Sequence, residues 1–154
     1  MKRNNIIIFL LVLSVMLVTG CESGFKTKTC TKTAASSDNS MSLSTETIIY
    51  YKNDYVLKTV STEKLTSSSS SILEMYKNAA ESSYSKYKDI KYYDNTITMG
   101  NTTLTSKTII DYRKVDYKKI LEVEGESGNI FTKDGKVKLT TLTKLYTDAG
   151  LECE

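Results

Sequence analysis

The sequence contains no histidine, proline or tryptophan, and only three of its 154 residues are cysteines. Without histidine the chain cannot form a Ser-His-Asp or Cys-His catalytic group, and it also lacks a Gly-x-Ser-x-Gly elbow and a Gly-Lys-Ser/Thr phosphate loop. Zinc binding is disfavoured because zinc sites draw on Cys and His at short spacings. With no proline, element ends must be read from Gly, Asn and Asp.

Some short patterns imitate motifs of the penicillin-binding proteins. Ser61 and Lys64 have the Ser-x-x-Lys spacing, as do Ser83 and Lys86. The segment Ser37-Asp38-Asn39 copies a second motif, but the order is wrong and the Lys-Thr-Gly element is missing. Ser61 is also expected on a strand, whereas the nucleophile of that family opens a helix. We therefore predict no catalytic residue and no enzyme.

Carboxylates are the remaining candidates for catalysis or metal binding. Asp111 and Asp116 could form a glycosidase pair, and Glu122, Glu124 and Glu126 could bind calcium. The acidic trio lacks the alternating Asp/Asn loop of an EF-hand, so a solvated loop is the simpler interpretation. We interpret Asp111 as a charge at a strand end and Asp116 as a helix cap. No metal and no cofactor are predicted.

The amino terminus has the layout of a signal peptide. Lys2 and Arg3 precede an apolar stretch over residues 6–18, which is shorter than the roughly 20 residues of a membrane-spanning helix. Val18-Thr19-Gly20-Cys21 then matches the lipobox of bacterial lipoproteins, in which the cysteine thiol receives a diacylglyceryl group and the peptidase cuts before it. We predict a signal peptide over 1–20, lipidation of Cys21, a tether over 21–29 and one domain over 30–154.

Cleavage before Cys21 changes the size and charge of the chain. It leaves 134 residues, since 154 − 20 = 134, and lowers the net charge from +3 to +1 because Lys2 and Arg3 are removed. This near-neutral balance offers no basic patch for nucleic acid. Two acyl chains give stable anchoring, so we expect the protein on the outer face of the cell membrane. The excess of lysine over arginine, with abundant Ser, Thr and Asn, favours a Gram-positive source.

Two cysteines remain when Cys21 is lipidated. Cys30 lies in the alternating segment KTCTKT, which can add an edge strand, and Cys153 follows Gly150 by three residues. Disulfides persist outside the reducing cytoplasm, so we predict a Cys30–Cys153 bridge that joins the first strand to the carboxyl end. Metal binding is the alternative, and it is weakened by the missing histidine.

Two hairpins and three helices are expected in the domain. Strands over Met41–Tyr51 and Tyr55–Lys64 are joined by a turn at Asn53-Asp54, since both residues tolerate positive φ. This turn predicts one face with Ile49, Tyr51, Val56 and Val60, and another with Ile48, Tyr50 and Leu57.

The main helix follows the serine run. Ser71 with Glu74 has a capping-box pattern, and a helical apolar face extends to an end near Lys88. Leu73, Tyr76, Ala80, Tyr84 and Tyr87 form this face.

A second hairpin is expected with Gly100-Asn101 as its turn, which pairs Ile97 with Leu104. Its alternation of apolar and polar residues is typical of a half-buried antiparallel sheet. A short helix over 116–122 and a final helix over 139–149, ended by Gly150, complete the domain. The fold class is therefore α+β: an antiparallel sheet built from two hairpins, with one main helix and a C-terminal helix packed on it.

Four segments carry a resemblance to a known family: YYKNDYVLKTVST, YSKYKDIKY, SKTIIDYRKVDYKKILEV and DGKVKLTTLTKLYTDAGLEC. Together they resemble the YehR-like bacterial lipoproteins, a family with a domain of unknown function, over roughly Thr27 to Cys153. The best marks are Asp111-Tyr112, the run from Val115 to Lys119, and Gly150-Leu151. The resemblance implies a compact α+β lipoprotein domain of the cell envelope, and it brings no active site with it.

Eleven tyrosines are a high share for a chain without tryptophan. Tyrosine suits recognition because it offers a large contact area and a hydrogen-bonding tip at low entropy cost. The expected core faces do not explain Tyr50, Tyr55 and Tyr92, so we predict these three as a possible binding surface. Half-buried sheet tyrosines are the alternative.

Three functions are compatible with these features. The favoured one is a non-enzymatic binding or accessory module of the cell envelope, which recognises a protein, peptide or wall component through its open sheet face. The alternatives are a small enzyme of carboxylate or Lys/Tyr chemistry and a structural spacer. An exposed aromatic patch would favour the first, a cleft with converging carboxylates the second, and a featureless polar surface the third.

Overall fold

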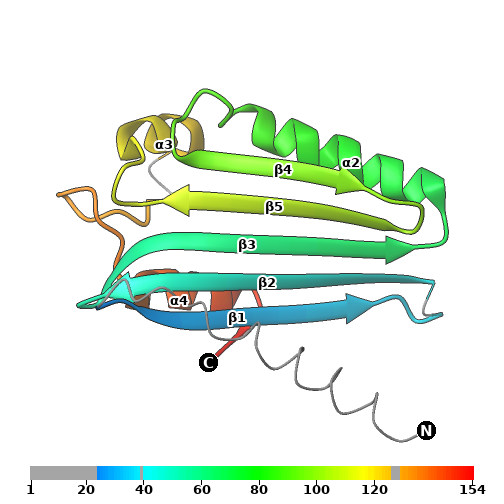
Figure 1. Cartoon of the computed structure of the whole chain (residues 1–154), viewed down its shortest axis with the longest axis horizontal. Coiled ribbons are helices and arrows are strands. Elements are labelled where there is room, and N and C mark those ends of the chain that lie inside the picture. The colour runs from blue at the N-terminus through cyan, green and yellow to red at the C-terminus, as the bar shows by residue number, and fades with distance from the viewer. Residues whose placement is uncertain (1–23, 39, 126–128) are drawn as a thin grey trace, which may run out of the picture.

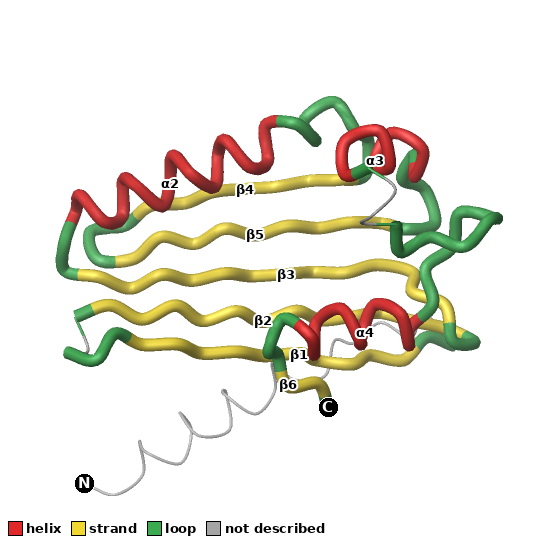
Figure 2. Tube along the Cα trace, turned by 180° about the vertical axis from the view of Figure 1, so that it is seen from behind, coloured by secondary structure: helices red, strands yellow, loops and turns green. Residues whose placement is uncertain are grey.

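The computed structural model describes residues 24–38, 40–125 and 129–154. Their elements are β1 (Lys26–Ala35), β2 (Met41–Lys52), β3 (Tyr55–Ser67), α2 (Ser70–Ser85), β4 (Tyr93–Met99), β5 (Thr103–Asp111), α3 (Tyr117–Glu124), α4 (Leu139–Asp148) and β6 (Glu152–Cys153). In these residues, six strands form one antiparallel sheet in the order β4-β5-β3-β2-β1-β6. Helices α2 and α4 lie against the same face of the sheet (Figures 1 and 2). The α+β class is thereby confirmed.

The sheet begins earlier in the chain than the sequence indicated. Residues 26–29, which the sequence analysis assigned to the tether, form the first part of β1 and pair with residues 48–51 of β2. This polar Lys-Thr segment forms a strand because it pairs with β2, and the apolar side chains of β2 provide the buried contacts that the segment itself lacks. The predicted signal peptide and Cys21 lie outside the described residues.

The first hairpin contains a bulge that the sequence did not reveal. Its turn is the predicted one, with positive φ at Asn53 and Asp54. The register between β2 and β3 shifts beside Tyr50, which leaves Leu57 as an extra residue of β3. One extra residue moves every later side chain to the other face. Val60 therefore lies on the face of Ile48 and Tyr50, so its predicted grouping with Ile49 is wrong.

The second hairpin has the predicted alternation of a core face and a solvent face, but its register differs. Ile97 pairs with Ser106, whereas the sequence predicted Leu104. The loop is longer than expected, and the Gly100 N–H donates to the Thr103 carbonyl at its base. A shift of two residues leaves each side chain on its face because two is the period of a strand.

The helices follow their predicted positions with small changes at the ends. The cap of α2 is Ser69, whose hydroxyl accepts from the N–H of Ile72, in place of the predicted Ser71. Neighbouring serines are chemically equal as caps, and the end of β3 decides which one is used. Asp116 caps α3 as predicted, and Gly150 with φ +83° follows α4.

The core lies between the sheet and its helices in two clusters. The smaller one joins Leu73 of α2 to Leu65 and Leu104 of the sheet. The larger one lies under α3, α4 and the loops beside them, and includes Cys30, Ile49, Val56, Tyr112, Ile120, Val137 and Leu142. Cys30 and Cys153 are opposite each other on β1 and β6 and form the predicted disulfide, with 4.0 Å between their Cα atoms.

Candidate functional site

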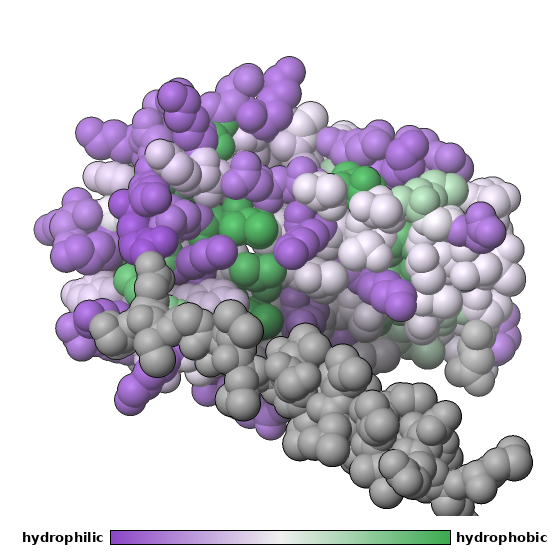
Figure 3. All heavy atoms as spheres, viewed as in Figure 1, coloured by the Kyte–Doolittle hydropathy of each residue, from purple (hydrophilic) through white to green (hydrophobic). Residues whose placement is uncertain are grey.

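A row of three aliphatic side chains crosses the sheet face opposite the helices. Ile109 of β5 pairs with Val60 of β3, and Val60 pairs with Ile48 of β2. We call these three residues the apolar row; each is partly exposed. Figure 3 shows hydrophobic residues in the middle of this open face, with hydrophilic residues around them. The row is therefore an apolar strip with a polar surround.

An aromatic pair adjoins the apolar row on the side of the β2–β3 turn. The rings of Phe25 and Tyr50 meet edge to face, with their centroids 5.7 Å apart. The ammonium group of Lys58 lies 5.8 Å from the centroid of the Tyr50 ring. Phe25, Tyr50, Leu57, Lys58 and Arg113 line a shallow cavity of about 200 Å³. The cavity can take an apolar group and place a cation beside it.

The rest of the open face is rich in hydroxyl groups and carries charges of both signs. On the side away from Tyr50, the next cross-strand row contains Glu46 and Lys107, with threonines between and beside them. At the other end Asp111 forms an ion pair of 2.7 Å with Arg113. The hydrogen bonds from Arg113 are the main cause of the lowered pKa of the Asp111 carboxyl group.

The three tyrosines singled out from the sequence lie at one end of the sheet, in three separate settings. Tyr50 is on the open face. Tyr55 lines a cavity of about 530 Å³ beneath the β2–β3 turn. Tyr92, 47% exposed, precedes β4 and has a positive φ of 67°. Each ring has a lysine ammonium group near it: the Lys136 group is 5.3 Å from the Tyr55 centroid and the Lys114 group 5.4 Å from that of Tyr92.

A groove of about 420 Å³ lies on the helix side, between α2 and α4. Its floor carries small hydroxyl residues, and the Thr47 and Ser61 hydroxyl oxygens are 2.9 Å apart. The Tyr146 hydroxyl of α4 is hydrogen-bonded to both of them. Burial raises the pKa of the phenols of Tyr93 and Tyr146. A proton-transfer catalyst at neutral pH needs the opposite shift, so these tyrosines can offer hydrogen bonds but no base.

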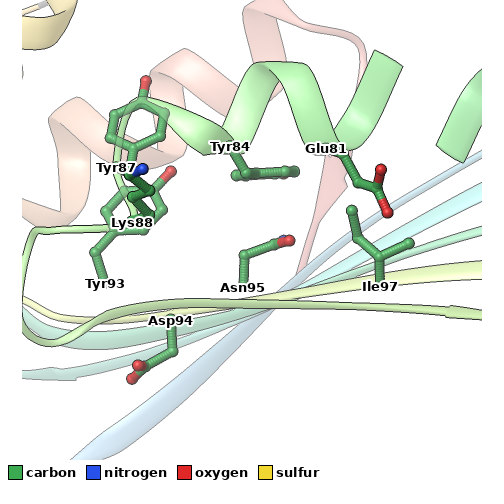
Figure 4. A pocket seen from close by; sticks show the side chains of 8 residues that line it. All are labelled: Glu81, Tyr84, Tyr87, Lys88, Tyr93, Asp94, Asn95 and Ile97. Atoms are coloured by element: carbon green, nitrogen blue, oxygen red, sulfur yellow. The ribbon is translucent and has the colours of Figure 1, made fainter. Parts of the chain in front are cut away.

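A further groove separates α2 from the free edge of the sheet. Figure 4 shows Glu81 and Tyr84 of α2 opposite Asn95 and Ile97 of β4, across a cavity of about 450 Å³. Because β4 is an edge strand, alternate backbone N–H and C=O groups point outward from it. The groove can therefore accept an extended peptide that adds a strand to the sheet.

The carboxylates considered from the sequence do not converge. Asp111 bonds Arg113, and Asp116 accepts from the backbone N–H of Lys118 and Lys119, as a helix cap does. Glu126 lies outside the described residues. Among the residues described, no group of three or more His, Cys, Asp or Glu side chains could hold a metal ion. In the same part of the chain, no helix is long and apolar enough to span a membrane.

Sequence reasoning missed the apolar row and Phe25. The three members of the row come from three strands, and only the long-range pairing of β3 with β5 brings Ile109 beside Val60. Phe25 fell within the predicted tether, where an aromatic side chain has no assigned partner. An aromatic residue in an otherwise polar linker was the signal that could have found it.

The comparisons with known proteins identify the fold and the family. The model of the family described as "Protein of unknown function (DUF1307)" matches residues 30–152. The NMR structure of the Escherichia coli YehR protein superposes with a TM-score of 0.52 at 23% identity, covering 85% of this chain and 93% of that one. An NMR structure of a protein from Streptococcus pneumoniae TIGR4 gives a TM-score of 0.53 at 16% identity, covering 88% of each chain. No curated protein matches the sequence. The chain thus belongs to the DUF1307 family, whose function is unknown.

Proposed function

We propose that the protein is a lipid-anchored, non-enzymatic binding module on the outer face of the cell membrane. Its partner is a protein, peptide or wall component of the envelope that docks on the open sheet face. The observation that carries this proposal is the apolar row beside the Phe25–Tyr50 pair, on a face that neither α2 nor α4 covers. The lipobox at Cys21 supports the anchor.

The composition of this face fits that of a binding surface. Burial of apolar area contributes about 25 cal/mol per Å², so the row supplies the driving force where a partner covers it. Aromatic residues are enriched in interface centres, and charged residues at the rim set the orientation of the partner. Lys58, Lys107 and Asp111 are placed as such a rim, because they lie in the cross-strand rows on either side of the apolar row. A structural spacer has no need of this arrangement.

Photo-crosslinking in cells tests the binding site. A photoreactive amino acid at position 60 probes the apolar row, and the same amino acid at Leu145 of α4, which is 49% exposed, probes the helix side as a control. We expect a discrete crosslinked product from position 60 and none from position 145. Val60→Thr, which keeps the branched shape, should weaken capture through a probe at position 48, whereas Thr62→Ser on the same strand should not. Equal products from both probe positions would contradict the proposal.

Lipidation is tested separately. Cys21→Ala removes the thiol that accepts the diacylglyceryl group, so a fatty-acid analogue supplied to growing cells should no longer label the protein. Cys30→Ala leaves Cys21 intact and serves as the control. Label that persists on the Cys21→Ala protein would refute the lipid anchor, and it would leave the proposal for the binding site unaffected.

A second candidate is capture of an extended peptide in the groove between α2 and β4. In the described part of the chain β4 pairs with β5 alone, and the outward backbone groups of such an edge strand match those of another extended chain. A photoreactive residue at Ile97 distinguishes the two sites. A crosslinked product from position 97 and none from position 60 would show that the partner binds at the edge of β4 and not on the open face.

A further inference from the structure

One end of the sheet differs in charge from the rest of the molecule. This is the end that holds the β2–β3 turn, the start of β4 and the end of β5 (Figure 1). The chain passes through it in five segments: 24–26, 50–58, 88–92, 111–125 and 129–138. These segments contain twelve Lys or Arg and seven Asp or Glu, a net charge of +5. The remaining described residues contain seven Lys and nine Asp or Glu, a net charge of −2. The domain is therefore electrically polarised along its strands.

The aromatic residues of this basic end have a shared chemistry. Tyr50 and Tyr55 come from the segment 50–58 and Tyr92 from the segment 88–92, and each ring has a lysine ammonium group within 6 Å of its centroid. Phe25 adds a fourth ring against Tyr50. Rings with a polar tip, next to long lysines, are the side chains that settle at the level of lipid headgroups. Clustered Lys and Arg are attracted by anionic lipids.

The tether brings this end, and no other, close to the lipid. Only three residue steps separate Cys21 from Gly24, so a fully extended chain spans at most about 11 Å between them. Gly24 adjoins the basic end, because Lys26 pairs with Tyr51 at the β2–β3 turn. Strand β4 runs from this end to Met99 at the opposite end over seven residues, so the two ends lie roughly 20 Å apart at about 3.4 Å per residue.

From charge, aromatic chemistry and tether length together, we propose that the basic end rests on anionic phospholipid headgroups and holds the domain upright on the membrane. The proposal rests on the lipidation of Cys21. It goes beyond the anchor because it assigns an orientation: the strands point away from the bilayer. The apolar row then stands next to the headgroups, so a partner of the open face is met at the membrane surface.

Tryptophan reporters test the orientation, since the chain has no tryptophan of its own. The mature lipidated protein carries Tyr50→Trp, Tyr55→Trp or Tyr92→Trp, and Met99→Trp at the far end is the control. Each variant is placed in vesicles of phosphatidylglycerol or of phosphatidylcholine that contain brominated acyl chains. We expect the bromine to quench the first three reporters in phosphatidylglycerol and to leave Met99→Trp unquenched. Equal quenching at position 99, or none at all four positions, would overturn the proposal.

Charge variants supply the matched comparison. The triple variant Lys58→Gln, Lys114→Gln, Lys136→Gln removes the cations beside the three tyrosines. Its control is Lys64→Gln, Lys107→Gln, Lys144→Gln, which removes the same charge elsewhere. Each lysine near an anionic surface contributes a factor of roughly five, so three should shift the orientation equilibrium about a hundred-fold. We expect quenching of Tyr92→Trp to be lost in the first triple variant and kept in the control; equal behaviour would overturn the proposal.

Flotation separates failure of the anchor from failure of the orientation. If the wild-type protein does not float with either kind of vesicle, the anchor is refuted and the orientation with it. If the protein floats but the reporters at positions 50, 55 and 92 stay unquenched, the anchor stands and the basic end does not touch the lipid. A return of fluorescence at 1 M salt supports the electrostatic contact, because screening shortens its range to about 3 Å.

Discussion

We expect the double substitution Cys30→Ala, Cys153→Ala to lower the free energy of unfolding by up to about 5 kcal/mol. The disulfide closes a loop with a sequence separation of 123 residues, and the chain-entropy model gives this figure for such a loop. It is an upper value because the unfolded chain is more compact than a random coil. Replacing both cysteines avoids a free thiol, and Cys30 is fully buried, so alanine keeps the site apolar.

The local structure around the bridge adds a second effect. Strand β6 is only two residues long, and two backbone hydrogen bonds of 2.9 Å between Thr29 and Glu154 continue its pairing with β1. Without the covalent link such a short strand frays, because little else holds the carboxyl end in the sheet. In amide hydrogen exchange, the backbone N–H groups of Thr29 and Glu154 should then exchange with solvent faster. The N–H of Leu73, in the distant core cluster, should still exchange only through global unfolding.

Thermal unfolding with and without reductant is the assay. For a domain of this size, the loss should lower the melting temperature by about 10 to 20 °C. Reductant should lower the melting temperature of the wild-type protein by a similar amount and leave that of the double variant unchanged, which makes the variant its own control. If the two proteins melt within about 2 °C of each other under oxidising conditions, the entropic account of the bridge is wrong.

Three further changes test the packing. Burial raises the pKa of the Tyr146 phenol above its usual value of 10.0, so folding favours the protonated phenol. The free energy of unfolding, measured in urea, should therefore fall as the pH rises above about 10, and it should fall less steeply in Tyr146→Phe. Gly135→Ala forces a Cβ to 2.6 Å from the Tyr117 ring at φ +75°, so it should cost about 1 to 3 kcal/mol in urea unfolding, more than Gly125→Ala, which has positive φ but open space. Asp116→Ala removes the α3 cap and should cost about 1 kcal/mol in the same assay.

The local features of the fold could be predicted from the sequence. Asn53 and Asp54 fix a hairpin because few residues accept positive φ, and Gly150 ends a helix for the same reason. The Cys30–Cys153 pairing followed from the compartment expected for the chain and from the small number of cysteines. The turn and the helix end each depend on one or two neighbouring residues. The disulfide joins residues 123 positions apart, but it could be predicted because only two cysteines remain to pair once Cys21 is assigned to lipidation.

The features that depend on the register between distant strands could not be predicted. Nothing in the β3 sequence marks Leu57 as the extra residue of a bulge, because a leucine in regular pairing has the same neighbours in the chain. The bulge reverses the side-chain alternation of β3, and so it decides whether Val60 joins the core or the open face. The candidate site depends on that choice, since Val60 is the middle of the apolar row.

The distribution of polarity across the sheet supports the proposed binding role. Thr47 and Thr59 are 1% exposed on the helix side, whereas Ile48 and Val60, each the next residue in the chain, remain partly exposed on the open face. A sequence selected for stability alone would place the larger aliphatic groups under the helices and the threonines outside. Natural sequences depart from such consistency mainly at functional sites. The buried threonines have polar contacts, since the Thr47 hydroxyl oxygen lies 2.9 Å from that of Ser61 and Tyr112 is hydrogen-bonded to Thr59. The exposed aliphatic groups have no such local explanation, and the proposed binding role accounts for them.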